Sequence, residues 1–139
     1  MTFVLDNSVA LAWCFEGEQT PAILAVLDRL TETGAVAPLL WPLEALNGLL
    51  VAERRRRLTA DQRIHLAGFL RDLPITLDPE TATLAWDPTA RLAERFALSL
   101  YDATYLELAH RRRLPLATLD RPLRAAATTL GLELLPPAA

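Results

Sequence analysis

The chain has 139 residues, enough for one domain with a sizeable core, and carries a formal charge of -3 at neutral pH. A basic balance usually accompanies nucleic-acid binding, so the overall charge does not indicate that function. All 14 basic residues are arginines, which excludes chemistry that needs a lysine amine, and the single cysteine excludes an internal disulfide bond.

Strands and helices are predicted to alternate along the chain. The first half is expected to contain a strand at 2–5, helices at 9–15 and 20–33, a strand at 35–37, and helices at 41–57 and 59–72. The second half is expected to contain a strand at 75–77, helices at 80–85, 88–98 and 101–112, a strand at 116–118, a helix at 121–130 and a strand at 133–135. Thr20 and Pro21 are typical first residues of a helix, and Gly34 is a typical end.

This alternation predicts a single α/β domain with a mostly parallel sheet of four to five strands and helices on both faces. We expect the domain to span residues 1–135 and residues 136–139 to form a tail. The sequence shows no signal peptide and no apolar stretch long enough to cross a membrane, so we expect a cytoplasmic protein. In parallel sheets the functional site lies at the carboxyl ends of the strands, where Asp6 and Asp120 are expected.

Each aspartate at such a position has a structural explanation and a functional one. Asp6, Asp102 and Asp120 all stand at or near a predicted helix N-terminus, where an aspartate commonly caps the helix. Glu44 and Asn47 lie three residues apart on the helix at 41–57, beside an expected buried stripe. That stripe consists of Leu43, Leu46 and Leu50. Polar side chains that border a core need partners, although a local hydrogen bond would suffice.

Four carboxylates brought to one edge of a sheet would repel one another, and a cation would relieve that repulsion. Oxygen ligands select a hard cation such as Mg²⁺ or Mn²⁺, which can activate a water and stabilise charge on a phosphodiester. The two histidines and the one cysteine have no ligand spacing, which argues against zinc.

Four segments, in this order and spacing, resemble the PIN domain family. They are FVLDNSV, PLEALNGLL, YDATYLELA and LATLDRPLRAAATTLG, and they are most similar to the VapC ribonuclease toxins of prokaryotic toxin–antitoxin pairs. The resemblance extends from Phe3 to about Leu134. It implies an Mg²⁺- or Mn²⁺-dependent endoribonuclease that leaves a 3′-hydroxyl and a 5′-phosphate, forms a homodimer and binds a cognate antitoxin protein.

The resemblance also implies roles for individual residues. The family's metal-binding and catalytic acids correspond to Asp6, Glu44, Asp102 and Asp120. Supporting polar positions correspond to Ser8, Asn47 and Thr118. Some members carry a further acid behind the last aspartate, whereas the segment 121–124 here is Arg-Pro-Leu-Arg, so a second metal would be weakly held.

The remaining charged and aromatic residues allow several interpretations. The runs at 54–57 and 111–113 either complement helix dipoles, or bind RNA phosphates, or contact an acidic antitoxin segment. The candidate contact residues are Arg54, Arg55, Arg111 and Arg112. We expect Asp78 at an exposed or turn position, Glu107 solvated or ion-paired, and Trp13, Trp41 and Trp86 in packing roles.

Three other function classes compete with the toxin-like ribonuclease. A receiver domain or a haloacid-dehalogenase-like phosphatase also has an aspartate after its first strand, but both use a lysine, which this chain lacks. A PIN-like module could bind RNA or a partner without cutting, although clustered carboxylates without a function are costly to maintain. A PIN nuclease could instead act on structured DNA or in RNA processing; the small size of the chain favours the toxin-like interpretation.

Overall fold

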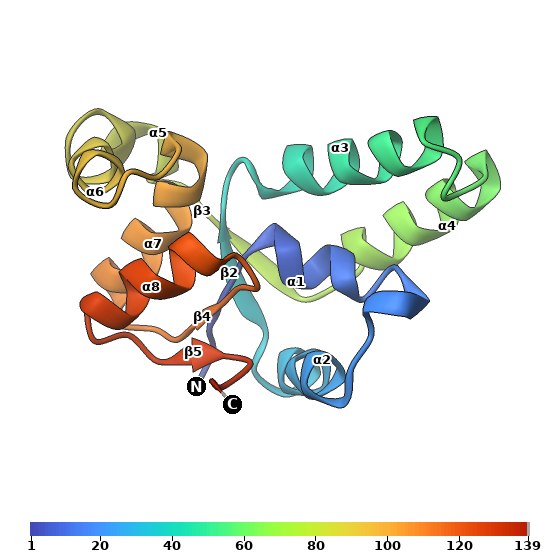
Figure 1. Ribbon diagram of the computed structural model, residues 1–139, viewed down its shortest axis with the longest axis horizontal. Helices are drawn as coiled ribbons and strands as arrows, with labels where there is room; N and C mark the ends of the chain where they lie inside the picture. The colour runs from blue at the N-terminus through green and yellow to red at the C-terminus, as the bar shows by residue number, and fades with distance from the viewer. Residues whose placement is uncertain (139) are drawn as a thin grey trace.

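The computed structural model describes residues 1–138 and shows an α/β fold around a five-stranded sheet whose strand pairs are all parallel (Figure 1). The strands are β1 (Val4–Leu5), β2 (Ala35–Pro38), β3 (Ile75–Asp78), β4 (Leu116–Ala117) and β5 (Leu134–Leu135). Their order across the sheet is β3-β2-β1-β4-β5, and the predicted fold class is confirmed. Residue 139, the last of the predicted tail, lies outside the described residues.

The helices largely occupy the predicted ranges. They are α1 (Asn7–Ala12), α2 (Pro21–Thr33), α3 (Trp41–Arg54), α4 (Ala60–Arg71), α5 (Thr81–Leu84), α6 (Ala90–Phe96), α7 (Leu100–Arg112) and α8 (Arg121–Thr129). A short 3₁₀ turn, η1 (Glu16–Glu18), follows α1, and a π-helical turn, η2 (Ala85–Thr89), joins α5 to α6. Within residues 1–138, no helix is both long and apolar enough to span a membrane.

The strand order places two sets of helices on opposite faces of the sheet. From β1 through β2 to β3 the chain moves one way across the sheet, whereas from β3 through β4 to β5 it moves the other way. Because crossovers between parallel strands are right-handed, the two directions put their helices on opposite faces. In Figure 1, α1 to α4 accordingly lie together on one side, and α7 and α8 on the other. The direction reverses between β1 and β4, which are neighbours in the sheet.

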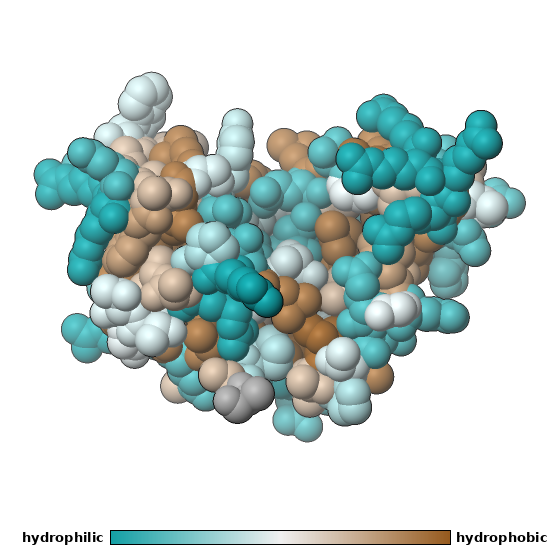
Figure 2. Space-filling model, viewed as in Figure 1, coloured by the Kyte–Doolittle hydropathy of each residue, from teal (hydrophilic) through white to brown (hydrophobic). Residues whose placement is uncertain are grey.

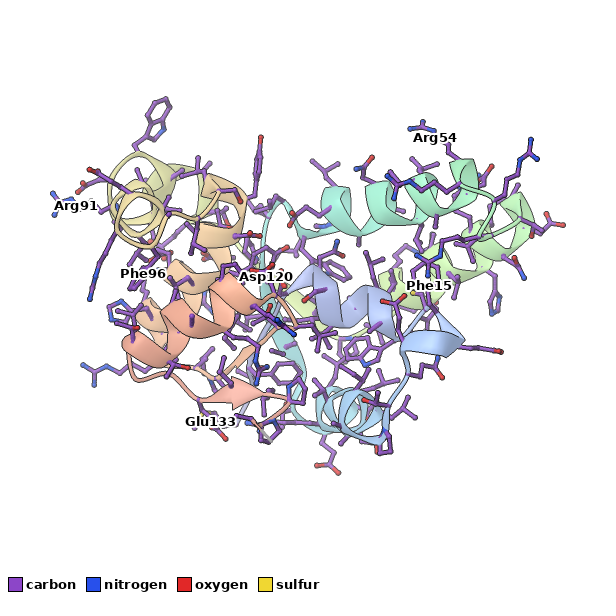
Figure 3. All side chains as sticks on the ribbon, viewed as in Figure 1. Phe15, Arg54, Arg91, Phe96, Asp120 and Glu133 are labelled. Carbon is purple, nitrogen blue, oxygen red and sulfur yellow. The ribbon has the colours of Figure 1, made fainter. Side chains whose placement is uncertain are left out.

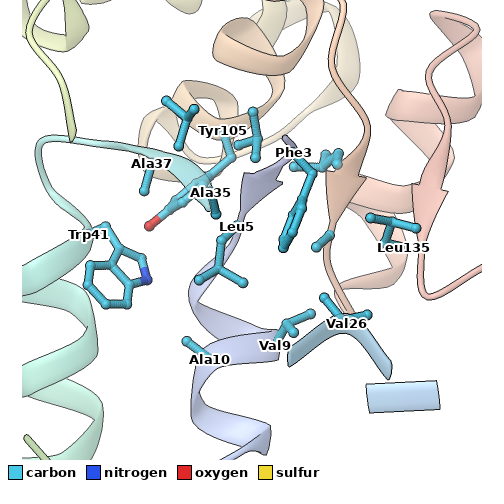
Figure 4. Close-up of a cluster of buried hydrophobic side chains, with 14 of the residues drawn as sticks. Phe3, Leu5, Val9, Ala10, Val26, Ala35, Ala37, Trp41, Tyr105 and Leu135 are labelled. Carbon is cyan, nitrogen blue, oxygen red and sulfur yellow. The ribbon is translucent and has the colours of Figure 1, made fainter. Parts of the chain in front are cut away.

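The core lies between these helices and the sheet, and Figure 4 shows part of it. Both residues of β1 and of β4 are fully buried, as expected for central parallel strands covered on two faces. Helix α7 packs across β1, β2 and β4 and is buried continuously from Ala103 to Ala109. The carboxyl ends of β1 and β4 are therefore held at one defined place, next to the start of α7.

Two packing predictions are wrong. The buried stripe of α3 consists of Trp41, Ala45, Leu49 and Ala52, whereas Leu43 is 73% exposed and Leu46 is 45% exposed. Helix α3 begins at Trp41 with its indole in the core, so the buried stripe follows Trp41 at helical spacing and leaves Leu43 and Leu46 outside it. Trp86 is 89% exposed in the π-helical turn, so it is not a packing residue.

Candidate metal and nuclease site

The first part of the site is the end of β1, where the chain leaves the sheet. The register of β1 with β4 pairs Leu5 with Ala117, so Asp6 and Thr118 follow their strands side by side. Asp6 is only 6% exposed, and its Oδ2 accepts hydrogen bonds from the Ser8 hydroxyl at 2.6 Å and the Thr118 hydroxyl at 2.8 Å. Two neighbouring donors thus hold one oxygen of a buried carboxylate.

The two hydroxyls are themselves fixed by the loop after β4. Ser8 Oγ accepts a hydrogen bond from the backbone N–H of Leu119 at 2.9 Å, and Thr118 Oγ1 accepts one from the N–H of Asp120 at 3.1 Å. Each hydroxyl oxygen accepts a hydrogen bond from a backbone N–H, and its own O–H group donates a hydrogen bond to Asp6. The hydrogen-bond network ties the end of β1 to the loop that carries Asp120.

Asp120 caps the last helix. Its Oδ2 accepts a hydrogen bond from the N–H of Leu123 at 3.0 Å, which is the capping role considered for it from the sequence. Its Oδ1 accepts no hydrogen bond within the described part of the chain. Capping and ligand binding are therefore compatible at this residue, since each needs a different oxygen.

Asp102 and Glu44 reach the site from two helices. Asp102 lies in the first turn of α7, where its backbone N–H donates to Ser99 Oγ at 3.1 Å. Glu44 lies in the first turn of α3, and its Oε1 accepts a hydrogen bond from the Tyr105 hydroxyl at 2.5 Å. Tyr105 was not among the expected site residues; its only signal in the sequence is its place in the YDATYLELA motif, three residues after Asp102.

The pKa values show that the four acids act on one another. Burial raises the pKa of Asp6, Glu44 and Asp102. The negative charges of Asp6 and Asp102 raise the pKa of Glu44 further, and those of Asp6 and Asp120 do the same for Asp102. The fold thus brings together the four predicted acids, and they repel each other when ionised.

The donor set suits a hard divalent cation in kind, because it consists of carboxylate oxygens. The Oδ1 of Asn7, which follows Asp6, is also buried and has no hydrogen-bond partner among residues 1–138. In residues 1–138, however, no group of three or more His, Cys, Asp or Glu side chains is close enough to hold a metal as it stands. The acids would have to draw closer together to bind an ion. The positive charge of that ion would offset the repulsion between them.

Three further predicted site residues lie on or next to α3 and form no hydrogen bond with the four acids in the described part of the chain. Asn47 is exposed, and its side chain forms no hydrogen bond with the described residues, so the structure gives no contact for its supporting role. Arg54 and Arg55 are exposed at the far end of α3, about 15 Å from Glu44 along the helix axis. Figure 3 labels Arg54 there, well away from Asp120, and Figure 2 shows hydrophilic side chains gathered at this end.

Arg111 and Arg112 form ion pairs within the protein, Arg111 from a partly buried position and Arg112 from an exposed one. Arg111 forms ion pairs with Asp78, with Glu107 at 2.9 Å and with Glu80 at 3.0 Å, and Arg112 contacts Asp78 at 3.3 Å. Asp78 is 1% exposed, so its expected exposed or turn position is wrong, and Glu107 is buried as well as ion-paired. The role of Arg111 and Arg112 as RNA or antitoxin contacts stays a prediction; within the described chain their guanidinium groups bind these carboxylates.

Comparisons with known proteins agree with this fold. The family profile described as "PIN domain" matches residues 3–128. Among solved structures, PAE2754 from Pyrobaculum aerophilum is similar, with a TM-score of 0.63, 23% sequence identity, and coverage of 94% of this chain and 93% of that chain. At this identity the likeness supports the fold alone. A search of the curated proteins gave no match.

Proposed function

Because this chain belongs to the PIN domain family, generally a nuclease fold, we propose that it is a metal-dependent endoribonuclease. The observation that carries the proposal is the convergence of Asp6, Glu44, Asp102 and Asp120 at the β1–β4 reversal, where each raises the pKa of a neighbour or has its own pKa raised. Keeping acids that repel their neighbours at one place costs stability, and a bound cation would offset that cost.

The same four carboxylates would hold Mg²⁺ or Mn²⁺. When bound, such an ion activates water and neutralises charge on a phosphodiester. The protein's own contribution is orientation: Ser8 and Thr118 fix one oxygen of Asp6, and the α8 N–H of Leu123 fixes one oxygen of Asp120. Residues that orient ligands in this way typically affect metal affinity 10- to 100-fold, so Ser8 and Thr118 belong to the proposed site.

The biological role that we propose is the toxin of a toxin–antitoxin pair. The four segments that resemble VapC toxins support it, and the resemblance adds a homodimer, a cognate antitoxin and a cytoplasmic location to the proposal. Arg54 and Arg55 remain proposed contacts for RNA or antitoxin, because the structure leaves both exposed. On the same resemblance we propose Asn47 as a supporting residue, although its side chain forms no hydrogen bond with residues 1–138.

A second candidate is a PIN-like module that binds RNA or a partner protein without cutting. It is favoured by one observation: among residues 1–138, no three potential ligands are already close enough to hold an ion. The two candidates differ in whether metal brings about cleavage.

Cleavage of a mixed RNA pool by Asp102→Asn tests the proposal. We expect the wild type to cut with Mg²⁺ or Mn²⁺ and not with a chelator, and the variant to lose more than about 100-fold of this activity, beyond the loss typical of residues that only support ligands. Asp28→Asn, the same change at an exposed position on α2, is the matched control and should retain activity.

The fold of Asp102→Asn is expected to be intact, because the substitution removes a repelling charge at a half-buried position. Circular dichroism and thermal melting check this. Full activity of Asp102→Asn would contradict the assignment of this residue. Metal-independent RNA binding without cleavage by the wild type would favour the binding module.

A further inference from the structure

Tyr105 contacts the candidate site from inside the core. It lies on α7, three residues after Asp102, and is 0% exposed. Figure 4 shows its ring among buried side chains, with the hydroxyl pointing toward the side on which Trp41 begins α3. The hydroxyl oxygen is 2.5 Å from Oε1 of Glu44, although the two residues are 61 positions apart in the sequence.

The direction of this hydrogen bond is fixed by chemistry. A phenol carries its proton at neutral pH, so the Tyr105 hydroxyl donates and Glu44 Oε1 accepts. Tyr105 therefore holds one defined oxygen of Glu44.

The contact also restricts the orientation of Glu44. A glutamate has several rotatable bonds, and a half-buried one on the first turn of a helix would otherwise sample several positions. With Oε1 held by Tyr105, Oε2 is the oxygen that accepts no hydrogen bond within residues 1–138. Helix α7 therefore carries Asp102 directly and sets the position of Glu44 through Tyr105, so that a single rigid element controls two of the four acids.

We propose that Tyr105 is a positioning residue that holds Glu44 with Oε2 available to a divalent cation. This inference deepens the proposed function and depends on it, because it concerns the same site. A positioning residue next to a metal ligand typically changes metal affinity 10- to 100-fold. Tyr105 would do so without touching the ion.

The test is the dissociation constant of Mn²⁺, measured by isothermal titration calorimetry on the full chain. We expect Tyr105→Phe to weaken Mn²⁺ binding at least 10-fold, while the melting temperature without metal changes little, because the ring still fills the core. Cleavage by the variant should recover at higher Mn²⁺ concentrations. Tyr101→Phe is the matched control, since it removes the other tyrosine hydroxyl of the chain from an exposed position on the same helix.

A double-mutant cycle isolates the role of Glu44. In a Glu44→Ala background, Tyr105→Phe should cause no further loss of Mn²⁺ affinity, because the group that it positions is gone. If Tyr105→Phe lowers only the metal-free melting temperature and leaves Mn²⁺ affinity unchanged, Tyr105 is a core residue and the inference is overturned. If the wild type binds no Mn²⁺, the proposed metal site is itself wrong and the inference fails with it.

Discussion

At the scale of single residues, Arg111 is a charged side chain that stabilises the fold through ion pairs. Its guanidinium contacts two almost fully buried carboxylates, Asp78 from the end of β3 and Glu107 from α7, and also the more exposed Glu80. Hydrogen bonds with Glu107 and Asp78 keep its pKa above the usual value for arginine. A buried carboxylate without a partner would be costly, so Arg111 contributes to the fold by pairing with both acids.

Replacing Arg111 with Met should therefore lower the free energy of unfolding by about 3–5 kcal/mol, because the buried Glu107 loses its partner and the buried Asp78 keeps only its contact with Arg112. Arg54→Met, the same change at the exposed end of α3, should change it by less than about 0.5 kcal/mol. Urea unfolding followed by circular dichroism measures both values. A stable Arg111→Met protein that had lost RNA binding would instead support the contact role predicted from the sequence.

At the scale of secondary structure elements, the packing of α1 against α3 positions two of the site acids. Helix α1 starts immediately after Asp6, and α3 carries Glu44 one turn before Gly48. A Cβ atom at Gly48 would lie 2.6 Å from Cδ1 of Leu11, so the glycine allows the two helices to approach closely. This explains a residue that is otherwise unfavourable within a helix.

Gly48→Val should lower the free energy of unfolding by about 1–3 kcal/mol, because a branched side chain overpacks the contact with Leu11. Gly48→Ala should stay within about 1 kcal/mol of the wild type, since the end of the flexible Leu11 side chain can move and alanine gains about 1 kcal/mol of helix propensity. Thermal and urea unfolding compare the two. Equal stability of Gly48→Val and Gly48→Ala would show that the helices are not in tight contact here.

At the scale of the whole molecule, the fold and much of the candidate site follow from patterns of sequence. The strand-and-helix alternation predicts the parallel sheet, and the positions of Asp6 and Asp120 after β1 and β4 predict where the acids meet. Contacts between distant segments could not be predicted. One example is the hydrogen bond from Tyr105 to Glu44, and another is the ion pair of Arg111 with the buried Asp78. Both depend on how α3, α7 and β3 pack against one another, which no local sequence pattern encodes.

The same arrangement makes the stability of the whole molecule depend on pH in an unusual direction. The ordinary pKa values are 3.8 for aspartate and 4.5 for glutamate, and in the folded protein those of Asp6, Glu44 and Asp102 are all raised. Above the ordinary values and up to the raised ones, the folded chain binds more protons at these sites than the unfolded chain. The contribution of the three groups to stability therefore falls as pH rises through this window, by about 1.4 kcal/mol for each unit of pKa difference.

We accordingly expect the melting temperature of the metal-free wild type to fall relative to that of Asp102→Asn as the pH rises from about 4.5 towards neutrality. The comparison with the variant isolates the site from other titrating groups, and Asp28→Asn should behave like the wild type because its change is exposed on α2. Millimolar Mg²⁺ should oppose the loss near neutral pH, where the carboxylates are ionised and can bind it, and have little effect in acid. Differential scanning calorimetry with Mg²⁺ or with chelator measures this difference. In chelator, the wild type could instead become more stable relative to Asp102→Asn as the pH rises. That result would mean that the acids do not repel one another in the folded protein.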